Sequence, residues 1–144
     1  MDAREYLETV RAAQRGIDRR LAVIESVRAQ RYDAVGKGAH GTDFMRSTDD
    51  RIDYERRSGA ELSELRREVE RGRELCAGVR SANPGKRWGD VLELRYCEDR
   101  TLQEIAGTLG VSVRSVHSDM SSALDWVDMV GVATARAGVG RAAI

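Results

Sequence analysis

Residues 101–116, TLQEIAGTLGVSVRSV, have the pattern of two short helices joined by a tight turn. Thr101 and Glu104 form a T-x-x-E capping box, which predicts a helix that begins here. Gly110 falls where the end of that helix needs a left-handed residue, a conformation that glycine adopts at least cost. Ser112 then predicts the cap of a second helix. Two helices joined this tightly must cross steeply, so the stretch predicts a helix-turn-helix.

Apolar residues on both sides of the turn repeat at helical spacing. In the first helix Ile105 and Leu109 form the predicted buried stripe, and Ala106 is small enough for the second helix to approach closely. The stripe predicted for the second helix comprises Val113, Val116, Met120, Ala123 or Leu124, and Val127. A supporting helix is predicted upstream, with Trp88, Val91, Leu92 and Tyr96 on its apolar face.

Residues 91–127 resemble region 4 of sigma-70-type transcription factors. The resemblance rests on VLELRY at 91–96, on the segment from Thr101 to Ser112, and on the Ala-Leu pair at 123–124. With its long helical N-terminal half, the whole chain is similar to small phage and prophage regulators of the ArpU and RinA type. The resemblance implies DNA binding, control of phage late-gene transcription and contact with RNA polymerase. Region 4 normally has an apolar residue in place of Asp119, so we expect Met120 to take over the packing there.

The second helix of such a motif enters the major groove of double-stranded DNA, which predicts its contact residues. Those expected to face DNA from this helix are Ser112, Arg114, Ser115, His117, Ser118 and Ser121. Arg114 has the chemistry to read a guanine edge, and serine hydroxyls bond to bases or phosphates. Phosphate contacts from neighbouring segments are expected of Lys86, Arg87, Arg95 and Arg100.

The charge balance argues against strong independent DNA binding. The chain has 24 Lys and Arg against 24 Asp and Glu. Residues 84–144 carry seven basic and eight acidic side chains, a net charge of −1. A DNA-binding protein without a basic surplus must concentrate its positive charge locally. Either this part binds DNA within a dimer or larger complex, or its fold serves protein contacts.

The N-terminal half has two helical segments, 2–32 and 49–81, with a glycine-rich segment between them. Seam positions at alternating three- and four-residue steps are predicted at Leu7, Val10, Gln14, Ile17, Leu21, Ile24, Arg28 and Arg31, and at Leu62, Leu65, Val69, Gly72, Cys76 and Val79. We expect an antiparallel coiled-coil hairpin in which the two stripes bury each other, with a flexible loop at 33–48. Because each stripe is thin, we also expect homo-oligomerisation through the hairpin.

These patterns predict an all-α chain in three parts. Residues 1–82 are expected to form the long antiparallel hairpin, and residues 83–128 the sigma region 4-like helix-turn-helix domain. The Asn83-Pro84 pair is expected to cap and begin the supporting helix. Residues 129–144, rich in glycine and small residues, are expected to be a flexible tail.

Other functional classes find little support in the sequence. Cys76 and Cys97 lack metal-ligand spacing, so we expect them to be buried or free thiols in a reducing cytoplasm. The two histidines, His40 and His117, lie far apart in the sequence, which argues against a zinc site. No catalytic or nucleotide-binding motif is present, so we expect no enzyme, no cofactor and no metal. Without an apolar run of about eighteen residues or a signal peptide pattern, the chain is expected to be soluble and cytoplasmic.

The sequence therefore favours a phage or prophage transcription regulator that reads the major groove with the helix after Ser112. A helical adaptor for protein contacts that has lost DNA binding is the alternative that the charge balance supports. A small terminase-like packaging protein combines the same elements, usually with the DNA-binding part first.

Overall fold

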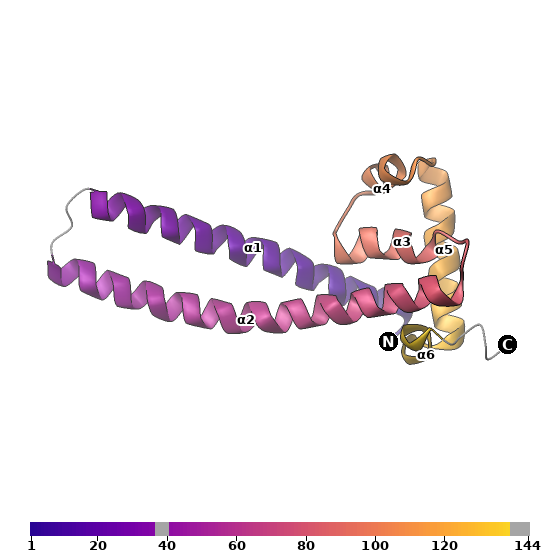
Figure 1. Ribbon diagram of the computed structural model, residues 1–144, viewed down its shortest axis with the longest axis horizontal. Helices are drawn as coiled ribbons and strands as arrows, with labels where there is room; N and C mark the ends of the chain where they lie inside the picture. The colour runs from indigo at the N-terminus through magenta and orange to yellow at the C-terminus, as the bar shows by residue number, and fades with distance from the viewer. Residues whose placement is uncertain (37–40, 139–144) are drawn as a thin grey trace.

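The computed structural model describes the backbone of residues 1–36 and 41–138, and their side chains except for 31–48 and 51 (Figure 1). The elements in this part are α1 (Ala3–Gly36), α2 (Gly41–Ala82), α3 (Trp88–Leu92) with its π-helical continuation η1 (Glu93–Cys97), α4 (Leu102–Leu109), α5 (Val113–Val130) and α6 (Val132–Ala137). No strand occurs in these ranges, which confirms the predicted all-α fold. No helix among the described residues is long and apolar enough to cross a membrane.

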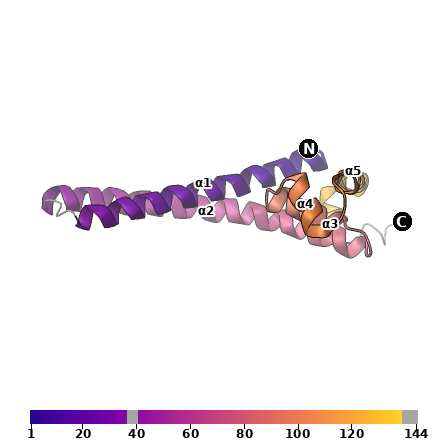
Figure 2. The same cartoon turned by 90° about the horizontal axis from the view of Figure 1, so that it is seen from above.

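The two longest helices, α1 and α2, form the predicted antiparallel hairpin, an extended arm in Figures 1 and 2. Asp2 and Glu5 begin α1 by bonding each other's backbone amides at 2.7 and 3.2 Å. Further along, α1 and α2 approach closely because Gly72 lies against Val10, where an added Cβ would come within 2.6 Å of Val10 Cγ1. Ile17 and Leu62 are among the residues buried along the arm.

The seam of the hairpin departs from the strict heptad that the sequence predicts. Leu21 is 42% exposed, so its placement in the seam is wrong, whereas Ala13 is buried. Gln14 is only half-buried and bonds Asp18. The buried residues Val10, Ile17 and Ile24 keep a seven-residue repeat, whereas Ala13 takes the place in the seam that was predicted for Gln14.

The break between α1 and α2 is shorter than predicted. The flexible loop expected at 33–48 is wrong for 33–36 and 41–48, because α1 continues to Gly36 and α2 begins at Gly41. The remaining positions, 37–40 with His40, lie outside the described residues. Apart from their glycines, the segments on both sides contain residues that are compatible with a helix. The number of glycines therefore led to a predicted loop that is too long.

The C-terminal helices cover the end of the hairpin at which α1 begins and α2 ends. The apolar stripes of α1 and α2 therefore pack against these helices as well as against each other. Leu7 of α1 and Leu75 of α2 have no exposed surface and belong to the same hydrophobic cluster as Tyr96 and Val127. The amide of Ala3 donates a 2.7 Å hydrogen bond to Asp128 at the far end of α5. A thin helical pair therefore gains its core from the C-terminal unit of its own chain.

Residues 129–138 are not the flexible tail that the sequence predicts. After α5 ends at Val130, α6 packs its fully buried Ala135 against α2. Gly78 makes this contact possible, because a Cβ there would overlap the carbonyl oxygen of Ala135. Arg136 adds a 2.7 Å hydrogen bond to the hydroxyl of Tyr6 and lies over its ring. Small residues here serve close packing, and positions 139–144 lie outside the described residues.

Asn83 ends α2 and does not cap the following helix as predicted. Its amide side chain donates to the carbonyl of Val79 at 3.0 Å, which satisfies the end of α2. Pro84 and Gly85, the latter with φ of 84°, form the turn that follows. The next helix begins only at Trp88, after Arg87, and no side chain caps it.

Candidate nucleic-acid interface

The first helix of the predicted motif forms as the sequence requires. Thr101 Oγ1 accepts a hydrogen bond from the amide of Glu104 at 3.2 Å, and Glu104 accepts one from the amide of Thr101 at 3.3 Å. The hydrogen bonds from Thr101, followed in effect by the charge of Arg100, hold the pKa of Glu104 below its usual value. Gly110 ends α4 in the left-handed conformation, with φ of 67°. The capping box and the turn are therefore confirmed.

The second helix, α5, is capped by Ser112, whose Oγ accepts from the amide of Ser115 at 3.1 Å. The hydroxyls of Ser112 and Ser115 also bond each other at 3.0 Å. Both were expected to contact DNA, but part of their hydrogen-bonding capacity is spent on the cap. All predicted stripe positions except the first are buried, at Val116, Met120 and Val127 and at both of the alternatives Ala123 and Leu124.

Val113 is the exception, since it is 39% exposed and its predicted burial is wrong. Val113 is the first residue of α5, and the residues of this helix that are buried in the core begin at Val116. Of the side chains expected to face DNA, Arg114, His117 and Ser118 are exposed and Ser121 is half-buried. The first two turns of α5 thus present one guanidinium, one imidazole, one hydroxyl and one apolar group.

Arg87 is already engaged within the protein. Its Nε lies 2.8 Å from Asp119 Oδ2, which ties the segment before α3 to the middle of α5. Asp119 retains only 19% of its side-chain exposure. This pair explains how an acidic residue is accommodated at a position where an apolar one was expected, while Met120 is buried as predicted.

The other expected phosphate contacts are spread around the supporting helix. Arg95 Nη1 donates a 2.9 Å hydrogen bond to the carbonyl of Arg100. Arg100 itself lies 3.5 Å from Glu104 and 3.9 Å from Glu98. Lys86 is exposed, with its ammonium 5.5 Å from the centre of the Trp88 ring. Only Lys86 therefore presents its charge without a hydrogen-bonding or ionic partner among the described residues.

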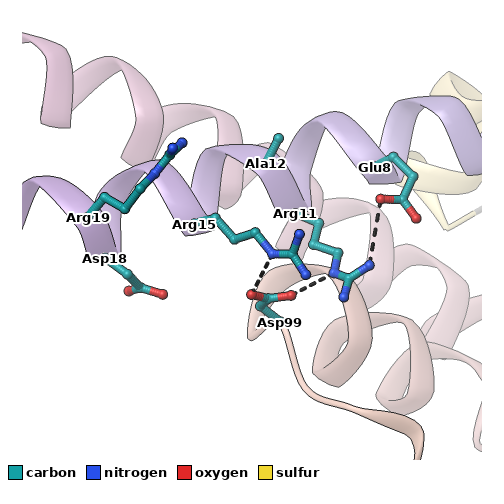
Figure 3. A pocket seen from close by; sticks show the side chains of 7 residues that line it. All are labelled: Glu8, Arg11, Ala12, Arg15, Asp18, Arg19 and Asp99. Carbon is teal, nitrogen blue, oxygen red and sulfur yellow. Dashed lines mark hydrogen bonds and ion pairs between the residues drawn. The ribbon is translucent and has the colours of Figure 1, made fainter.

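Asp99 locks the start of the helix-turn-helix to the hairpin, a contact that the sequence analysis missed. Its carboxylate accepts hydrogen bonds from Arg11 Nε at 2.6 Å and Arg15 Nε at 2.9 Å (Figure 3). Burial raises the pKa of Asp99, but its bonds and charge interactions with Arg15 and Arg11 outweigh this and leave the pKa below its usual value. Its φ of 53° marks a left-handed turn held in place by tertiary contacts.

The pocket around Asp99 has a volume of about 600 Å³ and is lined mostly by charged side chains of α1. Figure 3 shows Glu8 beside Arg11, with Asp18 and Arg19 one turn beyond Arg15. Three arginines and three carboxylates balance here, so the pocket has no net charge with which to attract an anion. It functions as a junction between the arm and the helix-turn-helix.

The two cysteines are structural, as expected for buried thiols. Cys76 of α2 and Cys97 at the end of η1 are both free and fully buried. A hydrogen bond between them, together with burial, raises the pKa of Cys76 well above its usual value. Among the described residues, no group of three or more His, Cys, Asp or Glu side chains is arranged to hold a metal ion.

Comparison with known proteins gives one match. Residues 87–126 match the model of the Sigma-70, region 4 family. The match begins just before α3 and ends within α5, so it leaves out the hairpin and α6. Neither the curated proteins nor the solved structures contain a match to this chain. The segment from α3 to α5 is thus a helix-turn-helix similar to sigma-70 region 4.

Proposed function

We propose that the protein is a DNA-binding transcription regulator that reads the major groove with the first turns of α5. The observation that carries this proposal is the exposed trio Arg114, His117 and Ser118 at the start of the second helix of a sigma region 4-like motif. Arginine pairs bidentately with guanine, and hydroxyl groups bond to several base edges. Such side chains at the start of a groove-facing helix are typical of direct base readout.

Phosphate contacts would come from the edges of the same unit. Lys86 is exposed before α3 and supplies a positive charge beside the start of the motif. Arg87 is a weaker candidate than the sequence indicated, because Asp119 already neutralises it. Few free cations imply modest affinity for any one helix-turn-helix unit.

A phage or prophage origin and a contact with RNA polymerase belong to this proposal through sequence resemblance. The resemblance to regulators of the ArpU and RinA type includes the long helical half that precedes the motif. The match to sigma-70 region 4 supports a role next to RNA polymerase. The role proposed for this chain is that of an accessory regulator of transcription.

Self-association through the hairpin completes the proposal. The arm exposes Leu21, Val23 and Ile52, three large apolar side chains on its outer half. Pairing two chains there would cover this surface and present two copies of α5 to two half-sites, which compensates for weak single contacts. Sedimentation equilibrium should then detect a species larger than 16 kDa at tens of micromolar, whereas a monomer alone would remove this part of the proposal.

The alternative is a helical adaptor that has lost DNA binding. The observation in its favour is electrostatic: Asp119 and Asp125 lie on α5 itself, and Asp119 neutralises a neighbouring arginine. Under this alternative the exposed start of α5 contacts a protein. The helix-turn-helix fold would then be present without affinity for DNA.

Selection of bound sequences from a random duplex pool with the purified full chain decides between the two. The regulator proposal predicts a reproducible enriched site of a few base pairs per α5, with binding that weakens as salt rises. Absence of enrichment, together with no binding of any duplex at low salt, would leave the adaptor as the better account.

A further inference from the structure

Val113 is the apolar side chain at the start of α5 that the protein core does not use. Large hydrophobic residues that remain exposed in the described parts of the chain are Met1, Leu21, Val23, Ile52, Val113 and Met129. Val113 alone among these lies in the first turn of the helix assigned to the groove. It sits directly between the capping Ser112 and the exposed Arg114.

Folding does not explain a valine at this position. The cap of α5 is made by Ser112 with Ser115, and the buried face begins at Val116. Valine has a lower helix propensity than most straight-chain residues, so it gives the helix no local advantage. With 39% of its surface open, the side chain leaves methyl groups facing outward beside Arg114.

The major groove offers one apolar group, the C5-methyl of thymine, and small apolar side chains recognise it by direct contact. We propose that Val113 reads a thymine methyl next to the base pair that Arg114 reads. This inference rests on the proposed DNA-binding function and assigns a specificity to its site. Val113 supplies an apolar contact, and Arg114 supplies the hydrogen bonds.

The spacing of the two residues fixes where the thymine lies. Consecutive Cα atoms are about 3.8 Å apart, and consecutive bases in one strand are stacked about 3.4 Å apart. Val113 therefore reaches a base within about one or two steps of the base that Arg114 contacts. His117, one helical turn after Val113, is exposed on the same side of α5 and borders this contact.

The test removes one methyl group at a time from the DNA. In the duplex enriched by selection, each thymine is replaced singly by deoxyuridine, which lacks only the C5-methyl. Affinity is measured for the full-length wild type, for Val113→Ala and for Met129→Ala. Met129 is the control, because it is an exposed apolar residue of the same helix, 67% open, that lies at the other end of α5 from Val113.

We expect deoxyuridine at one or two positions beside the guanine read by Arg114 to weaken wild-type binding about threefold to fivefold. This factor corresponds to the free energy of burying one methyl or methylene group. Val113→Ala should bind the thymine duplex less tightly and should lose this sensitivity, while Met129→Ala behaves as the wild type. Far-ultraviolet circular dichroism of Val113→Ala should match the wild type, since the residue is outside the core.

Three results would overturn the inference. Specific binding with no sensitivity to any deoxyuridine refutes the methyl contact and leaves the proposed function standing. Equal sensitivity in Val113→Ala assigns the methyl effect to another residue. Failure to enrich any sequence removes the proposed function and, with it, this inference.

Discussion

At the scale of single residues, ion pairs within the protein decide which charges remain for DNA. Arg87 and Asp119 are 32 positions apart in the sequence and lie 2.8 Å from each other in the fold. The pair neutralises one of the cations that we expected to contact phosphate. It also places a carboxylate on the helix that is expected to approach a polyanion. Formal charge counts therefore overstate the cations available and understate the importance of this one contact.

Asp119→Asn should strengthen binding to any duplex. It removes a negative charge from α5 and releases Arg87, so the slope of log affinity against log salt should steepen by about one unit. The free energy of unfolding should fall by less than about 1 kcal/mol, because the pair is partly exposed. Binding titrations at several salt concentrations measure both the affinity and the slope.

Asp125→Asn is the matched control for this prediction. Asp125 is exposed on the same helix, and its removal changes the net charge equally without freeing an arginine. Its salt slope should equal that of the wild type. If the two variants change the slope alike, Arg87 does not gain a phosphate contact.

At the scale of the helical elements, the turn between α4 and α5 depends on backbone conformation. Gly110 has φ of 67°, and a Cβ added there would meet no atom within 4 Å. The cost of a substitution is therefore conformational and not steric. Gly107, three residues earlier inside α4, also has open space around it, but its position is helical. Two glycines of one short helix thus have opposite requirements.

Gly110→Ala should lower the free energy of unfolding by about 1–2 kcal/mol, because an L-residue is strained in the left-handed region. Gly107→Ala should raise it by about 0.5–1 kcal/mol, because alanine is the better helix former. Urea unfolding followed by circular dichroism compares the two. A Gly110→Ala variant as stable as the wild type would show that the turn does not need its left-handed residue.

At the scale of the whole molecule, the helix-turn-helix is part of the core that also stabilises the hairpin. Contacts tie the first residues of α1 to α5, α6 and the loop before α4, at Ala3, Tyr6 and Arg11. The arm and the reading helix therefore hold a defined orientation. Two arms that pair would fix the separation of two copies of α5.

Asp99→Asn tests this junction, because asparagine tolerates the left-handed conformation and removes only the charge. At pH 7 we expect a loss of about 1–2 kcal/mol of stability, limited by the exposure of Arg15. Since the pKa of Asp99 is lowered in the folded state, its contribution is complete above the unfolded pKa of about 3.9 and is lost as pH falls through the folded pKa.

The measurement is the difference in urea midpoint between the wild type and Asp99→Asn as the pH is lowered from 7 to 3. The difference should begin to shrink below about pH 4, because the unfolded wild type then binds a proton at Asp99 that the folded protein, with its lowered pKa, does not yet bind. A difference that stays constant over this range would assign the effect to packing and not to the carboxylate.

Local signals were enough to predict the helix-turn-helix. Thr101, Glu104, Gly110 and Ser112 act through neighbours within a few positions, so their roles follow from spacing alone. Contacts between distant segments carry no such signal. The burial of Ala135 depends on how α6 meets α2, and the partners of Asp99 depend on how α1 meets the loop before α4. The pairing of Arg87 depends on how the segment before α3 meets α5.

The central claim, that α5 reads base pairs, is tested most directly by the binding of Arg114→Ala to the selected duplex and to a scrambled one. Lys86→Ala is the control, expected to weaken both alike and to reduce the salt slope by about one unit. Arg114→Ala should cost about 1–3 kcal/mol on the selected duplex, should cost much less on the scrambled one, and should relax the base preference at one position. Equal losses on both duplexes, or no loss on either, would contradict base reading by α5.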